Sequence, residues 1–276
     1  MDRIKNKVWI LSLVLLMLSL LAGCTNNSTI TEAKKRVIKV GVSPNTKIIV
    51  DAAVPVMKEK GYTIETTVFD DFVQPNTALS EGNIDCNLYQ HKPYMNAANE
   101  SQSTDLVFIN KIVLGTCGLY SNKYDSIDKL PENGRIAIFQ DASNQDRLLR
   151  LLEKGGLIKL QEKEGLYTLL DIAENPKNFE FVTMDINQLV TGLDELDACC
   201  EGDPSLFLAS TTPKFELLKE DSNDDFVLSF SVGLVANPRD AESQWIEDFV
   251  ESFKEQDTKD AIMENFGGAY TPVAEK

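Results

Sequence analysis

The sequence predicts an α/β protein built as two lobes with a ligand cleft between them. Short β-branched runs alternate with apolar residues at helical spacing along most of the chain. This alternation falls into two blocks, and the chain passes between them near residues 114–118 and 229–233, each of which contains a glycine. Alternating strands and helices predict parallel sheets covered by helices on both faces. Two connections between lobes form a hinge, which lets the lobes close around a ligand.

The first block has a strand–helix–strand rhythm that can be followed element by element. Apolar residues at helical spacing stop at Gly61, and the strands are short and rich in β-branched residues. The expected elements are a strand at 37–43, a helix at 47–61, a strand at 62–69, a short helix at 74–82 and a strand at 83–89. Ligands of open α/β sheets lie beyond the carboxyl ends of the strands, where Ser43, Phe72, Tyr89 and His91 are expected.

The second block repeats the rhythm and returns to the first lobe. Its helix at 143–156 has Ser143 as a plausible N-cap and Gly155 as its stop. The other expected elements are two strands within 106–121, strands at 134–139 and 179–184, a helix and a strand within 187–200, a long apolar run at 226–238, and helices at 241–256 and 257–267. The last two helices would complete the first lobe.

The N-terminus predicts export and lipid attachment. A basic start precedes an apolar run from Val8 to Ala22 and the tetrapeptide LAGC, the pattern of a bacterial lipoprotein signal cleaved before a cysteine. An ordinary signal with a chance cysteine is the alternative. We therefore expect a signal peptide at 1–23, lipidation of Cys24 and a tether at 24–36. The first lobe is expected at 37–114 and 232–276, and the second at 115–231.

Composition excludes some functions. The formal net charge of −16 and the lack of a basic stripe disfavour nucleic-acid binding. The chain has one histidine and no G-x-S-x-G, HExxH, Walker or G-x-G-x-x-G motif, so no enzyme and no cofactor is predicted. The remaining cysteines fit no paired CxxC spacing, so buried thiols are expected and a metal site is not, although a disulfide stays open. They are Cys86, Cys117, Cys199 and Cys200.

The single histidine lies in the segment NLYQHKPYM, residues 87–95. Tyr89 and His91 share one face if the strand reaches that far, and Tyr94 follows a proline turn. These flat rings suit a pocket for an apolar or thioether side chain. The alternatives are a buried histidine bonded to the backbone and an exposed loop residue.

Three blocks of the sequence resemble one known family. They are FDDFVQPNTALSEGNIDCNLYQHKPYM at 69–95, DASNQDRLLRLLEKGGLIKL at 141–160, and LLDIAENPKNFEF at 169–181. In this order, behind a lipobox, they resemble the methionine-binding lipoproteins of bacterial ABC importers. The resemblance implies a two-lobed, periplasmic-binding-protein-like α/β fold with a ligand cleft between the lobes.

The resemblance also implies roles for individual residues. Phe72, where the family usually has tyrosine, would wall the side-chain pocket with Tyr89, His91 and Tyr94. Arg147 matches the family arginine that grips the amino-acid carboxylate, a task that suits a planar, permanently charged guanidinium. Asn144, in the same block, is a further candidate. Without the resemblance, a solvent-facing helix position for Arg147 would be the simpler interpretation.

The sequence departs from the family where the ligand ammonium would be bound. The segment ACCEGDPSLFLA, 198–209, lacks the usual asparagine, and a second asparagine is missing near 230–235. Glu201 or Asp203 could replace the asparagine with a charge-assisted contact. Otherwise the ligand is not methionine.

These observations predict a lipid-anchored substrate-binding protein of an ABC importer, which captures methionine or a related small amino acid or short peptide. It would be a monomer on the extracytoplasmic face of the cell membrane, and would deliver the ligand to a permease powered by an ATPase. The alternative is a surface-exposed interaction lipoprotein on a binding-protein scaffold without a transported ligand.

Overall fold

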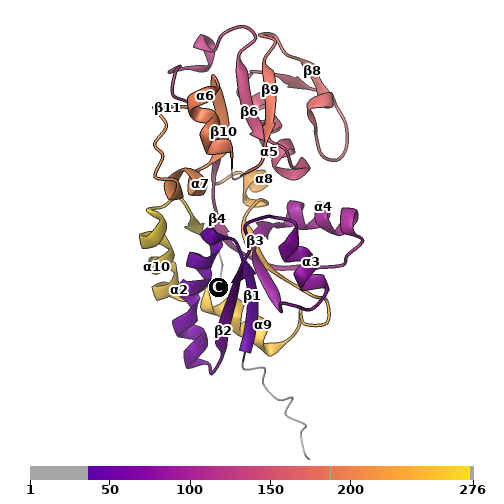
Figure 1. Ribbon diagram of the computed structural model, residues 1–276, viewed down its shortest axis with the longest axis vertical. Coiled ribbons are helices and arrows are strands. Elements are labelled where there is room, and N and C mark those ends of the chain that lie inside the picture. The colour runs from indigo at the N-terminus through magenta and orange to yellow at the C-terminus, as the bar shows by residue number, and fades with distance from the viewer. Residues whose placement is uncertain (1–36, 187, 274–276) are drawn as a thin grey trace, which may run out of the picture. The chain divides into compact units, whose positions relative to one another are not determined.

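The computed structural model describes residues 37–186 and 188–273. The expected signal peptide at 1–23, the lipidation site Cys24 and the tether at 24–36 lie outside the described residues. Two mixed sheets dominate the described part, each flanked by helices (Figure 1). This arrangement agrees with the two-lobed α/β fold expected from the sequence.

The first sheet has six strands in the order β13-β4-β12-β3-β1-β2. Ser43 caps the helix that follows β1, because its hydroxyl and that of Thr46 each accept a backbone N–H of the other residue. The strands are β1 (Val37–Val42), β2 (Thr63–Val68), β3 (Cys86–His91), β4 (Val107–Leu114), β12 (Val232–Ala236) and β13 (Thr271–Pro272). The helices of this lobe are α2 (Pro44–Glu59), α3 (Gln74–Ser80), α4 (Lys92–Gln102), α9 (Gln244–Ser252) and α10 (Gln256–Phe266).

The second sheet has five strands in the order β11-β5-β10-β6-β9, and a two-stranded sheet joins β7 to β8. The strands are β5 (Cys117–Ser121), β6 (Arg135–Phe139), β7 (Lys159–Leu160), β8 (Ile172–Glu174), β9 (Glu180–Met184), β10 (Ala198–Gly202) and β11 (Phe215–Lys219). The helices are α5 (Ala142–Lys154), α6 (Gly192–Glu195), α7 (Asp203–Leu208) and α8 (Asp225–Leu228), with 3₁₀ turns η1 (Ile127–Lys129), η2 (Leu169–Asp171) and η3 (Leu189–Thr191).

The sheets are mixed, which corrects the expectation of purely parallel sheets. Strand β1 pairs in parallel with β2 and β3, and β6 pairs in parallel with β9 and β10. The strands that lead from one sheet to the other, or return from it, pair antiparallel: β4 and β12 in the first sheet, β5 and β11 in the second. Parallel neighbours in each sheet need a crossover connection, usually a helix, whereas the strands that connect the two sheets run antiparallel to their neighbours.

The chain passes from the first sheet to the second between β4 and β5, and returns between β11 and β12. Gly115 lies at the first passage. A Cβ atom at this position would lie 2.6 Å from Cγ of Pro204 and 3.0 Å from Cε1 of Tyr270, so only glycine fits without a shift. We retain 37–114 with 232–276, and 115–231, as the proposed lobes.

Several element boundaries differ from those expected. The N-cap of α5 is Asp141 rather than Ser143, because the Asp141 carboxylate accepts the backbone N–H of Asn144 at 3.0 Å. The apolar run at 226–238 is not one strand, since α8 and a turn occupy its first part and β12 begins only at Val232. Helix α4 and strand β11 were not expected.

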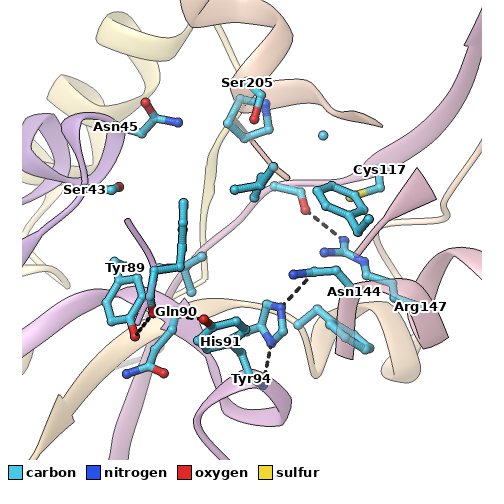
Figure 2. A pocket seen from close by; sticks show the side chains of 18 of the residues that line it. Ser43, Asn45, Tyr89, Gln90, His91, Tyr94, Cys117, Asn144, Arg147 and Ser205 are labelled. Atoms are coloured by element: carbon cyan, nitrogen blue, oxygen red, sulfur yellow. Dashed lines mark hydrogen bonds between the residues drawn. The ribbon is translucent and has the colours of Figure 1, made fainter. Parts of the chain in front are cut away.

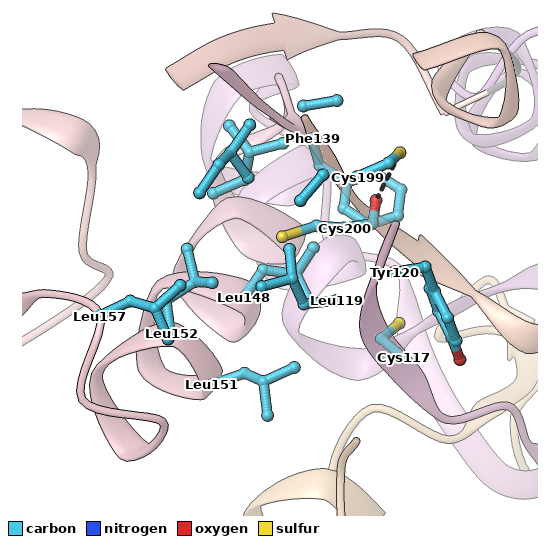
Figure 3. Packing of buried hydrophobic residues seen from close by; sticks show 14 of the residues in the cluster. Cys117, Leu119, Tyr120, Phe139, Leu148, Leu151, Leu152, Leu157, Cys199 and Cys200 are labelled. Carbon is cyan, nitrogen blue, oxygen red and sulfur yellow. Dashed lines mark hydrogen bonds between the residues drawn. The ribbon is translucent and has the colours of Figure 1, made fainter. Parts of the chain in front are cut away.

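The cysteines of the described residues are buried free thiols. Cys199 and Cys200 lie on β10 within the apolar core of the second sheet, to which Leu148 and Leu152 of α5 also belong (Figure 3). Burial raises the pKa of the Cys200 thiol far above its usual range, so this side chain behaves as a small apolar group. The described residues include no group of three or more histidine, cysteine or acidic side chains placed to hold a metal ion. Within the same residues, no helix is long and apolar enough to cross a membrane.

Candidate functional site

A cavity of about 100 Å³ is lined by residues of both lobes. Six of the eight residues proposed from the sequence to bind the ligand border it: Phe72, Tyr89, His91, Tyr94, Asn144 and Arg147. Ser43, expected beyond a strand end, borders it as well. The first four of the six come from β3, α4 and the segment before α3, whereas Asn144 and Arg147 come from the first two turns of α5. The structure therefore brings together residues from two distant blocks of sequence (Figure 2).

Aromatic rings form one wall of the cavity. The ring centroids of Phe72 and Tyr89 lie 5.7 Å apart, and those of Tyr89 and Tyr94 lie 6.1 Å apart in an edge-to-face arrangement. Both tyrosine hydroxyls donate to the backbone carbonyl of Phe72, at 3.0 and 2.9 Å. These bonds fix the rings and use the hydroxyl protons, so the wall presents mainly apolar ring surface to a ligand.

His91 lies where β3 ends and α4 begins. Its Nδ1 accepts the backbone N–H of Tyr94 at 3.1 Å, so the imidazole caps α4 and its proton must sit on Nε2. Nε2 then donates to Oδ1 of Asn144 at 3.0 Å, and Asn144 Nδ2 donates in turn to the carboxylate of Asp141. This chain of hydrogen bonds joins the two lobes across the cavity (Figure 2).

The imidazole is neutral at pH 7. Burial, and next the positive charge of Arg147, lower the pKa of His91 to about 4, although the hydrogen bond with Asn144 opposes the shift. His91 therefore acts as a hydrogen-bonding wall residue.

Arg147 is 4% exposed, which excludes the solvent-facing alternative. Its Nε and Nη2 donate to the two carboxylate oxygens of Glu220 at 2.7 and 2.6 Å, and Nη2 also donates to the carbonyl of Gly115 at 3.0 Å. Burial disfavours the charge on the guanidinium, but the nearby Cys117 and Glu220 together hold the pKa of Arg147 above its usual value. The ring of Phe230 lies 4.9 Å from the guanidinium carbon.

Glu201 and Asp203 do not border the cavity. Glu201 is fully buried on β10, where its Oε1 accepts the backbone N–H of Gly202 at 2.8 Å and Oε2 has no hydrogen-bond partner among the described residues. Burial raises the pKa of Glu201 to about 8, so the carboxyl is mostly protonated at pH 7.

The Asp203 carboxylate is engaged within its own lobe and at the passage between the sheets. It accepts the hydroxyls of Thr116 and Tyr120, at 2.6 and 2.5 Å, and pairs with Lys219. With three partners already in place, Asp203 has little capacity left for a ligand ammonium.

Sequence reasoning missed three aromatic lining residues: Phe139, Phe230 and Tyr270. Phe139 ends β6, so the rule that ligands lie beyond strand ends could have found it. Phe230 follows a short helix that was not expected, and Tyr270 lies in the C-terminal segment just before β13. Neither of these two carries a local signal in the sequence.

Comparisons with known proteins agree on one family. The model of the NlpA lipoprotein family matches residues 38–274. The D-methionine-binding lipoprotein MetQ of Salmonella typhimurium is 33% identical over 254 residues, which is 90% of this chain and 91% of that protein. The protein of the same name from Escherichia coli K12 is 31% identical over the same shares of the two chains.

A solved structure is also similar to this chain. A nutrient-binding protein from Burkholderia cenocepacia, bound to methionine, has a TM-score of 0.78 and 28% sequence identity. The match covers 86% of this chain and 99% of that one.

Proposed function

Because the chain belongs to the NlpA lipoprotein family, we propose that it is the substrate-binding component of an ABC importer and captures methionine or a related small amino acid or short peptide. The observation that most strongly supports this proposal is the cavity, which is lined by both lobes and combines an aromatic wall with a buried arginine. The rings suit an apolar or thioether side chain, and the arginine suits a carboxylate. The proposed ligand residues remain Phe72, Tyr89, His91, Tyr94, Asn144 and Arg147.

The proposal also covers the cellular location of the protein and its partners. The protein would be a monomer, held by a lipid on Cys24 at the extracytoplasmic face of the cell membrane, and would carry out no chemistry. It would pass its ligand to a membrane permease driven by an ATPase. Capture requires closure of the lobes, for which the His91–Asn144 hydrogen bond provides a contact across the cavity.

Calorimetry tests the proposal. The full-length chain in detergent, unfolded and refolded to remove carried ligand, is titrated with L-methionine, D-methionine, other amino acids and dipeptides. We expect saturable binding of at least one member of the panel at one site per chain. If no member of the panel binds, ligand capture is contradicted and the alternative, an interaction lipoprotein without a transported ligand, is favoured.

A further inference from the structure

The carboxylate of Glu220 limits what Arg147 can offer to a ligand. Of the five guanidinium N–H groups, one on Nε and one on Nη2 donate to Glu220, and the second on Nη2 donates to Gly115. The two on Nη1 have no partner within 37–186 and 188–273. Arg147 borders both the ligand cavity and a second cavity, whereas Glu220 borders only the second one. Glu220 therefore lies behind the guanidinium, and a ligand can reach Nη1 alone.

Glu220 is itself fixed in place. Its Oε2 accepts the backbone N–H of Cys117 at 2.7 Å, and its own backbone N–H donates to the carbonyl of Cys117 at 3.1 Å. A ligand carboxylate cannot displace it without leaving these groups unpaired in a buried site. A two-oxygen ligand group thus needs a second donor from outside the guanidinium.

Tyr270 is placed to supply that donor. It is 8% exposed and borders the cavity, and its hydroxyl has no hydrogen-bond partner in the described part of the chain. The Tyr270 ring lies against Gly115, the same residue whose carbonyl accepts Nη2 of Arg147. The two side chains therefore meet at Gly115. Burial raises the pKa of Tyr270 above its usual range, so the hydroxyl stays protonated and can donate.

We propose that Tyr270 is a specificity-determining residue whose hydroxyl, together with Nη1 of Arg147, binds the carboxylate of the ligand. The inference rests on the proposed function, because it assumes an amino-acid-like ligand. Arg147 belongs to the second lobe and Tyr270 to the first, so one carboxylate joined to both draws the lobes together. The tyrosines of the aromatic wall cannot take this role, since Tyr89 and Tyr94 already donate to the Phe72 carbonyl.

The test compares Tyr270→Phe with the wild type, using calorimetry of the full-length chain in detergent with two probes, L-methionine and L-methioninamide. The variant keeps the ring and removes one donor. We expect the Kd for methionine to rise about tenfold or more, because a hydrogen bond to a charged carboxylate is lost. The Kd for methioninamide, whose amide group carries no charge, should rise less than about threefold. Tyr124→Phe is the matched control, since Tyr124 packs, partly buried, against the core of the second lobe and does not line the cavity, and it should leave the Kd of both probes unchanged.

The outcomes separate this inference from the proposed function. If Tyr270→Phe weakens both probes by the same factor, or weakens neither more than Tyr124→Phe does, Tyr270 only packs and the inference is wrong while ligand capture stands. If neither probe binds the wild type, the inference fails together with the proposal of methionine as a ligand. Tyr270→Phe could also lower the melting temperature of the ligand-free protein while the ratio of the Kd for methionine to the Kd for methioninamide stays as in the wild type. That result would assign Tyr270 a structural role only.

Discussion

Replacement of Arg147 by leucine should lower the free energy of unfolding by about 3–5 kcal/mol, as expected when one partner of a buried ion pair is removed. The side chains of Arg147 and Glu220 are 5% and 3% exposed, and their closest nitrogen and oxygen lie 2.6 Å apart. The substitution leaves the Glu220 carboxylate buried without a counter-charge. Urea unfolding at pH 7 measures the loss.

Two further variants make this prediction specific. Arg147→Leu combined with Glu220→Leu should recover most of the stability, because no charge then stays buried. Arg135→Leu is the matched control, because Nε of Arg135 lies 3.9 Å from Oε2 of Glu180 and both side chains are at least half exposed. This substitution should lower the free energy of unfolding by less than about 1 kcal/mol. A loss for Arg147→Leu no larger than for Arg135→Leu would show that the buried pair does not stabilise the fold.

Glu201→Gln should stabilise the protein at pH 7 by about 3 kcal/mol, which is the cost of keeping a carboxyl of pKa about 8 protonated at that pH. The folded-state pKa is raised, so the wild type has its full stability below the usual value of 4.5 and loses it as the pH rises through 8. Glutamine has nearly the same shape and never ionises.

Unfolding of both proteins at pH 4, 7 and 9 tests this prediction. The difference between them should be near zero at pH 4 and should grow towards pH 9. Glu100→Gln, on the exposed side of α4, is the matched control and should change stability by less than about 0.5 kcal/mol at every pH. A difference that does not depend on pH would mean that folding does not raise the pKa of Glu201.

The aromatic wall of the cavity was predictable, because the positions of its residues follow from local patterns in the sequence. Strand alternation puts Tyr89 and His91 on one face of β3, and the position of Phe72 near a strand end brings it to the same edge of the sheet. Strand β3 ends at His91, two residues beyond the expected end at residue 89, so the condition for a shared face is met. His91 is also the N-cap of α4.

The environment of Arg147 was not predictable in the same way. Its partner Glu220 follows β11, a strand that pairs with β5 across about a hundred residues of sequence. Tyr270 reaches the cavity because the C-terminal segment pairs through β13 with β4. Such long-range pairings decide which polar groups meet in the cleft, and no local pattern in the sequence encodes them.

Small-angle X-ray scattering tests most directly whether the lobes close around a ligand. The chain from Thr25 onward, stripped of carried ligand, is measured alone and after saturation with the panel member that binds best. We expect the radius of gyration to fall on saturation, because the ligand joins Arg147 of one lobe to the aromatic wall and Tyr270 of the other. Scattering that is identical before and after saturation would contradict closure of the lobes as the mechanism of capture.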